Sequence, residues 1–90
     1  MYIMASKRNG TLYVGVTSDL PQRVYQHKTG ETAGFTDKYR VHLLVYYEMH
    51  GNIMDAVKRE KQIKLWKRIW KLRLIETVNP DWRDLADDIL

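Results

Sequence analysis

Three side chains in this 90-residue sequence have the chemistry that hydrolysis of a phosphodiester bond requires. That reaction needs a base for the attacking water, a cation beside the non-bridging oxygens and a metal ion that balances the developing charge. Tyr13 could supply the base, Arg23 the cation and Glu60 the metal ligand. Each falls in a different predicted element, so the fold must bring them together.

Each of these residues also has an ordinary structural interpretation. A tyrosine on a sheet face more often packs than reacts, and an isolated arginine on a helix is most often solvated. Glu60 falls where the helical pattern asks for an apolar residue, and an unpaired buried carboxylate is costly. It therefore needs a cation, a metal ion or solvent, and a surface pair with Lys64, one turn along, is the simplest alternative. Only the joint pattern favours chemistry.

Basic residues gather between positions 58 and 73, within a net charge of +4. Eight lysines and arginines stand there against one acid, Glu60, and the tail that follows is acidic. With Trp66 and Trp70 inside it, the stretch is typical of a surface that binds phosphate. The alternative is a solvated helix face over an aromatic core stripe. We expect Trp66, Trp70 and Trp82 to belong to the core rather than to stack on bases.

The first two strands are predicted over residues 2–5 and 12–17, with a turn at Asn9-Gly10. A two-residue turn pairs Ile3 with Val16 and sets Tyr2 opposite Thr17.

Alternation along these strands places aliphatic side chains on one face. The other face carries Tyr2 and Tyr13 beside Gly15, which is a first indication of a site. In the strict register the two tyrosines lie four residues apart, about 13 Å along the strand.

Capping residues delimit the first helix. Asp19 begins it, Pro21 falls in its first turn and Gly30 ends it. Arg23 and His27 are four residues apart and share one helix face.

Residues 43–47 form a continuous apolar run, as expected of a strand covered on both faces, and we expect it to be the middle strand. Asn52 caps a second helix through about Leu65. A third helix is predicted over roughly 67–76, and a short acidic tail helix that holds Trp82 follows Asn79-Pro80.

The length predicts a single domain over residues 1–90, with its core at about 2–76 and a tail at 77–90. There is no cysteine, no apolar run near the length of a membrane span and no secretory pattern at the start. We therefore expect a cytoplasmic protein without a membrane partner.

Several motifs in order resemble the GIY-YIG nuclease family. Tyr2-Ile3 and, eleven residues on, Tyr13-Val14-Gly15 are similar to its two tripeptides, and Asp19-Leu20-x-x-Arg23-x-x-x-His27 resembles its conserved helix. The remaining stretches resemble the small stand-alone bacterial branch of the family, related to the N-terminal nuclease domain found in excinuclease: Gly30, Phe35-Thr36-x-Lys38-Tyr39, Leu44-Val45-Tyr46-Tyr47-Glu48 and Ala56-x-x-Arg59-Glu60-Lys61-Gln62-Ile63-Lys64-x-Trp66. The resemblance runs from Tyr2 to about Trp82.

The resemblance implies an α/β (α+β) fold, in which a three-stranded antiparallel sheet is flanked by helices and followed by C-terminal helices. It also implies a longer hairpin loop than the strict Asn-Gly register, so that Tyr2 and Tyr13 can cooperate.

The resemblance also implies a role for each candidate residue. Tyr13 would be the general base or would position the water, and Arg23 would hold the scissile phosphate. Glu60 would be the sole protein ligand of one Mg²⁺ or Mn²⁺ ion. His27 would hydrogen-bond the phosphate or assist proton transfer, and Tyr2 would orient the water network.

Lys38, Lys64 and Asn79 are the expected substrate-binding residues. The expected function is a metal-dependent DNA endonuclease or nickase of low sequence specificity, a monomer or weak dimer, with a protein partner supplying specificity. RNA is an alternative substrate. Two alternative functions are a non-catalytic nucleic-acid-binding module of the same fold and a protein-interaction domain that uses the Trp66/Trp70 helix.

Overall fold

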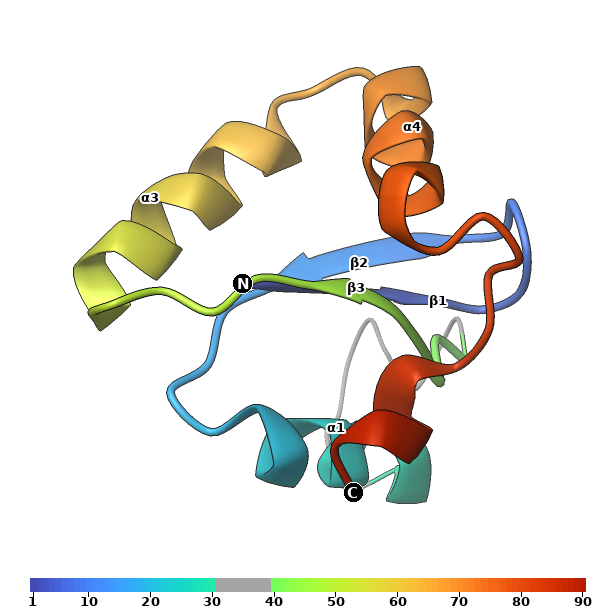
Figure 1. Cartoon of the computed structure of the whole chain (residues 1–90), viewed down its shortest axis with the longest axis horizontal. Helices are drawn as coiled ribbons and strands as arrows, with labels where there is room; N and C mark the ends of the chain where they lie inside the picture. Colours follow the sequence, from blue (N-terminus) through green and yellow to red (C-terminus); the bar gives the residue numbers. More distant parts are fainter. Residues whose placement is uncertain (31–39) are drawn as a thin grey trace.

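The protein is a three-stranded antiparallel sheet between two layers of helices (Figure 1). The structure is a computed structural model, and it describes residues 1–30 and 40–90. The elements are β1 (Tyr2–Ala5), β2 (Leu12–Gly15), α1 (Leu20–Thr29), β3 (Leu43–Tyr47), α3 (Ile53–Lys64), α4 (Arg68–Val78) and the 3₁₀ helix η1 (Leu85–Asp88). This confirms the expected α+β fold.

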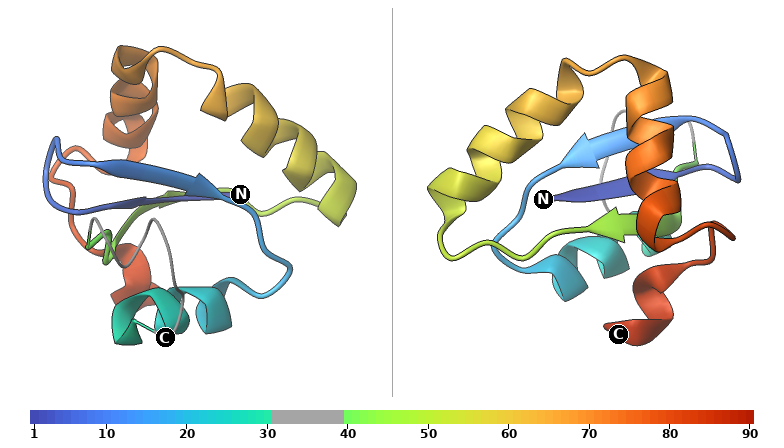
Figure 2. Two further views of the ribbon diagram at one scale, coloured as in Figure 1. Left: turned by 180° about the vertical axis from the view of Figure 1, so that it is seen from behind. Right: turned by 45° about the horizontal axis from the view of Figure 1, so that its top comes forward.

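Helices cover both faces of the sheet. Figure 2 shows α3 and α4 on one side of it and α1 on the other in both views. The α3–α4 side buries Ile3, Val14, Val45, Ile63 and Ile75 in one core cluster. The α1 side buries Tyr2, Met4, Val24, Leu44 and Ala86 in a second cluster, to which η1 contributes.

The strand order is β2-β1-β3, so the middle strand is β1. Our expectation that residues 43–47 form the middle strand was wrong. A continuous apolar run shows that a strand is covered on both faces, which α4 and η1 achieve for the edge strand β3. It does not show the order of pairing, and the four residues of β1 are equally buried.

The hairpin register also differs from the two-residue turn. Tyr2 pairs with Gly15 and Met4 with Tyr13, while the Ser6 N–H donates to the Thr11 carbonyl at 3.0 Å. The connection therefore spans residues 7–10 and is longer, as the resemblance implied. The shift of two residues keeps every side chain on its predicted face, because strands alternate with a period of two.

The helix ends follow the predicted caps. The side chain of Asp19 accepts a hydrogen bond from the Gln22 N–H at 3.2 Å, and Gly30 takes a φ of 75° at the end of α1. At the start of α3, Asn52 accepts from the Asp55 N–H at 3.0 Å.

The tail contains less helix than expected. α4 continues to Val78, and only residues 85–88 form η1, so Trp82 lies before that helix with a φ of 56°. No helix in the described ranges is both long and apolar enough to span a membrane.

Asp84 joins this tail to the rest of the fold. It accepts the Leu44 N–H of β3 at 3.1 Å and forms an ion pair with Lys28 of α1. Burial of the Asp84 carboxyl opposes ionisation, but these bonds outweigh it and hold its pKa below the usual value.

Candidate active site

Three rings from three elements meet on the α1 side of the sheet. The ring centroids of Tyr2 and Tyr13 are 6.2 Å apart, and that of His27 lies 5.7 Å from the first and 5.6 Å from the second. A hydrogen bond of 3.0 Å joins the Tyr2 hydroxyl to His27 Nε2. The structure therefore brings together three of the predicted site residues.

Gly15 makes this arrangement possible because it stands directly opposite Tyr2 in the sheet. A Cβ atom at position 15 would lie 2.6 Å from both Cζ and the hydroxyl oxygen of Tyr2, and 2.8 Å from Cε1 of Tyr13. Contacts this short do not occur, so any side chain at position 15 would displace the two rings. The glycine is required here for close approach, as its φ is not positive.

Electrostatics assign different roles to the two tyrosines. Burial raises the pKa of Tyr2 well above its usual value, Tyr13 adds to the rise, and Arg23 only partly opposes it. Tyr2 is therefore a neutral phenol at physiological pH. Tyr13 lies on the edge strand and is half-buried, so it is the more accessible phenol.

His27 is held in its neutral form. It is 3% exposed, and burial lowers its pKa, with contributions from Arg23 and His42. A neutral His27 shares the 3.0 Å hydrogen bond with the Tyr2 hydroxyl at Nε2, and the tautomer of the imidazole sets which of the two groups donates. Arg23 lowers the pKa of both Tyr2 and His27, in accordance with its expected position on the same face of α1 as His27.

Glu60 occupies the buried face of α3. It is 7% exposed and pairs with Lys64, whose side chain is 53% exposed. The pair named as the simplest alternative thus exists, although its carboxylate is buried rather than at the surface. α3 packs across the sheet from α1 and contacts β2, the strand that carries Tyr13.

The chemistry of the Glu60 carboxylate suits a hard divalent cation, and the Lys64 ammonium shows that a positive charge is held there. Within the described ranges there is no group of three or more His, Asp or Glu residues that could hold a metal. Among the described residues, a metal ion at Glu60 would therefore have fewer than three such side chains as ligands and would take the others from water and phosphate oxygens.

The other two predicted substrate-binding residues have different outcomes. Lys38 lies outside the described residues. Asn79 is buried, and its side-chain amide donates to the carbonyls of Val45 at 3.0 Å and Arg83 at 2.9 Å while accepting the Arg83 N–H. These bonds give Asn79 a structural function at the end of α4, and a role in substrate binding stays a prediction.

Sequence reasoning missed a polar network around Glu48. Arg59 donates to both carboxylate oxygens at 3.1–3.2 Å, and Tyr46 and His50 also bond to this carboxylate. The Arg59 guanidinium lies 5.2 Å from the centroid of the Trp66 ring. Apart from His50, these residues lie in the motif stretches 44–48 and 56–66, which are the signal that could have identified them. Because Arg59 directly precedes Glu60, the network positions α3 and thereby Glu60.

The tryptophans divide between core and surface. Trp82 is 4% exposed and Trp66 is half-buried, in accordance with the expected core positions. Trp70 is 56% exposed, so its assignment to the core was wrong. The reason is its place on α4, where Leu72 and Ile75 face the sheet and Trp70 points away.

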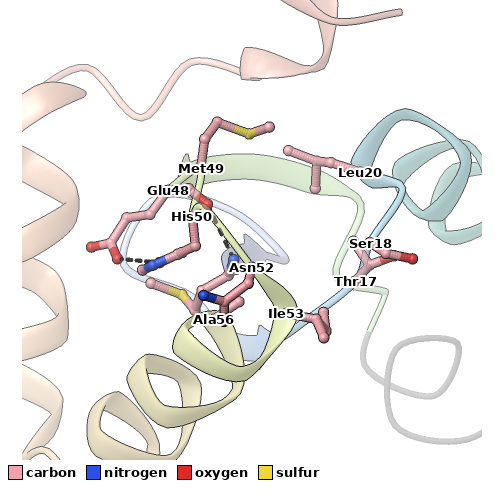
Figure 3. A pocket seen from close by; sticks show the side chains of 10 residues that line it. Thr17, Ser18, Leu20, Glu48, Met49, His50, Asn52, Ile53 and Ala56 are labelled. Atoms are coloured by element: carbon pink, nitrogen blue, oxygen red, sulfur yellow. Dashed lines mark hydrogen bonds and ion pairs between the residues drawn. The ribbon is translucent and has the colours of Figure 1, made fainter.

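A pocket of about 220 Å³ opens at the end of the sheet, between the β2–α1 loop and the start of α3 (Figure 3). Its lining includes Thr17, Ser18, His50 and Ile53, but not Tyr13, Arg23 or Glu60. The pocket therefore does not contain the reactive groups of the candidate site.

Comparison with known proteins identifies the class to which this fold and this cluster belong. Residues 1–73 match the GIY-YIG catalytic domain, and the chain therefore belongs to the GIY-YIG family of nuclease-type domains.

The chain is similar to several curated UPF0213 proteins of staphylococci. One from Staphylococcus saprophyticus is 40% identical over 75 residues, which cover 83% of this chain and 90% of that protein. One from Staphylococcus haemolyticus is 38% identical over 76 residues, covering 84% and 92%. One from Staphylococcus aureus is 43% identical over 68 residues, covering 76% and 83%. No solved structure matches the chain.

Proposed function

We propose that this protein is a metal-dependent endonuclease or nickase that hydrolyses phosphodiester bonds in DNA. The observation that carries the proposal is the packed cluster of Tyr2, Tyr13 and His27 beside Arg23, built around Gly15 in a chain of the GIY-YIG family. A nuclease needs such a constellation, whereas a binding module does not.

In this proposal each residue of the cluster has a separate role in the reaction. Arg23 binds the non-bridging oxygens of the scissile phosphate and stabilises the charge that develops on them. Tyr13 accepts the proton of the attacking water or positions that water. Tyr2, fixed by its hydrogen bond to neutral His27, keeps the water network and the imidazole in one orientation.

Glu60 would hold one Mg²⁺ or Mn²⁺ ion, which when bound stabilises charge on the phosphate oxygens. Lys64 is paired with Glu60, so a metal ion would have to replace the lysine at this carboxylate; the exposed lysine would then be available to bind a phosphate. Lys38 and Asn79 complete the proposed substrate-binding set.

The substrate is proposed to be DNA, acted on in the cytoplasm with low sequence specificity. A domain of this size covers little of a duplex, so specificity would come from a partner protein. The chain would act as a monomer or weak dimer.

The proposal is tested by nicking of supercoiled plasmid in Mn²⁺, in Mg²⁺ and in chelator. We expect nicking in the metals only, and its loss in Glu60→Gln. Asp81→Asn is the matched control, because it removes an exposed carboxylate from a surface position. Salt-sensitive retardation of DNA without cleavage in any metal would instead indicate the non-catalytic binding module.

A further inference from the structure

We propose that the outer face of α4, centred on Trp70, binds unpaired nucleotides by stacking, so that the preferred substrates contain a single-stranded segment. The inference rests on the proposed action on nucleic acid and names the substrate class.

The first observation is the exposure of large apolar side chains near the junction of α3 and α4. Trp70 is 56% exposed, and Leu65 and Ile69, which are close to it in sequence, are 88% and 50% exposed. Tryptophan is usually well buried, so a tryptophan that is exposed to this degree indicates an interaction surface.

The second observation is the positive charge on either side of Trp70. Lys67, Trp70 and Arg73 follow at intervals of three residues, so they form one strip along the exposed side of α4. Neither Lys67 nor Arg73 forms an ion pair within the described residues. The acid nearest to Arg73 is Glu76 of α4, which accepts a hydrogen bond from the Trp82 indole N–H at 2.9 Å, and Glu60 of α3 is paired with Lys64.

An exposed indole between two cations that form no ion pair within the described residues fits a nucleic-acid partner better than a protein partner. Cations on both sides of an indole match two successive phosphates and the base between them. A paired duplex offers the phosphates but keeps its bases stacked on one another, so it leaves the indole unused. α3 and α4 cover the same side of the sheet, so a strand held at Trp70 lies on the side that carries Glu60, across the sheet from α1 (Figure 2).

The test is fluorescence anisotropy with an oligothymidine strand and with a duplex of the same length, in chelator. Trp70→Ala should weaken single-strand binding by about 5- to 150-fold, which is the contribution of one stacked base, and should leave duplex binding within about twofold. Trp70→Phe keeps a ring face and should recover most of the loss.

Tyr25→Ala is the matched control, because Tyr25 is 55% exposed but lies on α1, outside the basic stretch. It should bind both ligands as the parent does. Lys67→Ala and Arg73→Ala should each remove one phosphate contact. Each should therefore reduce the steepness of log K against log[salt] for single-strand binding by about 0.7.

The proposal is overturned if Trp70→Ala binds the single strand as well as the parent. It is also overturned if Tyr25→Ala loses as much affinity for the single strand as Trp70→Ala does. The same holds if Trp70→Ala weakens binding of the single strand and of the duplex equally, or if the parent binds neither ligand. Because binding is measured without metal, these outcomes are separate from the nicking assay. Loss of stacking in Trp70→Ala would stand even if the parent cut no plasmid.

Discussion

Gly15→Ala is the substitution that examines the candidate site most sharply. It adds a single methyl group at a position whose φ does not require glycine, so any effect comes from contacts alone. That methyl carbon would lie 2.6 Å from Cζ and the hydroxyl of Tyr2 and 2.8 Å from Cε1 of Tyr13. Tyr2 is fully buried, so its ring cannot swing out into solvent to avoid the methyl group. The rings of Tyr2 and Tyr13 must therefore both be displaced.

The expected cost in stability is that of overpacking a core, about 1–3 kcal/mol. For a domain of this size, each kcal/mol lowers Tm by about 4–8 °C. The effect on nicking should be larger than the effect on folding. A displacement of about 1 Å in a reacting group can cost about 100-fold in rate.

The assay compares thermal unfolding and metal-dependent nicking for Gly15→Ala and Gly51→Ala. At position 51 an added Cβ meets nothing within 4 Å, so this control should match the parent in both measurements. A third variant, Gly15→Ala with Tyr2→Phe, removes the hydroxyl contact and should recover part of the lost stability. If Gly15→Ala unfolds and nicks like Gly51→Ala, the packed cluster is not what the reaction requires.

Three further predictions concern the surrounding network. Glu48→Gln removes the negative charge to which Arg59 donates hydrogen bonds at both oxygens, and it should lower the free energy of unfolding in urea by about 1–2 kcal/mol. The nicking rate should also fall, because α3 is no longer held in place. A parent-like free energy of unfolding together with a parent-like nicking rate would contradict the positioning role of this network. Asp84 has a lowered pKa in the folded protein, so the stabilisation by its carboxylate is present above the unfolded-state pKa near 3.8 and is lost as the pH falls through the folded-state pKa. Asp84→Asn should therefore reduce the loss of stability at acidic pH. An unchanged acid dependence in this variant would argue against the ion pair with Lys28. His27 also has a lowered pKa, so as the pH falls below about 6.5 its imidazole is protonated in the unfolded chain before it is protonated in the folded protein, and the free energy of unfolding should decrease. His27→Gln should remove this pH dependence. If the dependence persists in that variant, another group is responsible for it.

Local rules predicted the parts of the fold that depend on neighbouring residues. Asp19, Gly30 and Asn52 end their helices as expected, because capping depends on one side chain and the adjacent backbone. The face that carries Tyr2 and Tyr13 was also predictable, since alternation along a strand survives a register shift of two residues.

Non-local features were not predictable from the same rules. The apolar run at residues 43–47 could not reveal that β1 is central, because burial on both faces is common to middle and edge strands here. The exposure of Trp70 depends on which side of α4 meets the sheet, and the Glu48–Arg59 pair joins residues 11 apart in sequence across a turn. The motifs marked these positions without stating their contacts.

The central claim is that Tyr13 takes part in metal-dependent cleavage. The most direct measurement is the nicking rate of Tyr13→Phe in saturating Mn²⁺, beside Tyr25→Phe, which removes a hydroxyl from an exposed tyrosine outside the cluster. We predict that Tyr13→Phe stays folded, still binds DNA and loses nicking by about 100-fold or more, while Tyr25→Phe nicks like the parent. Equal nicking by Tyr13→Phe and the parent would contradict this role for Tyr13.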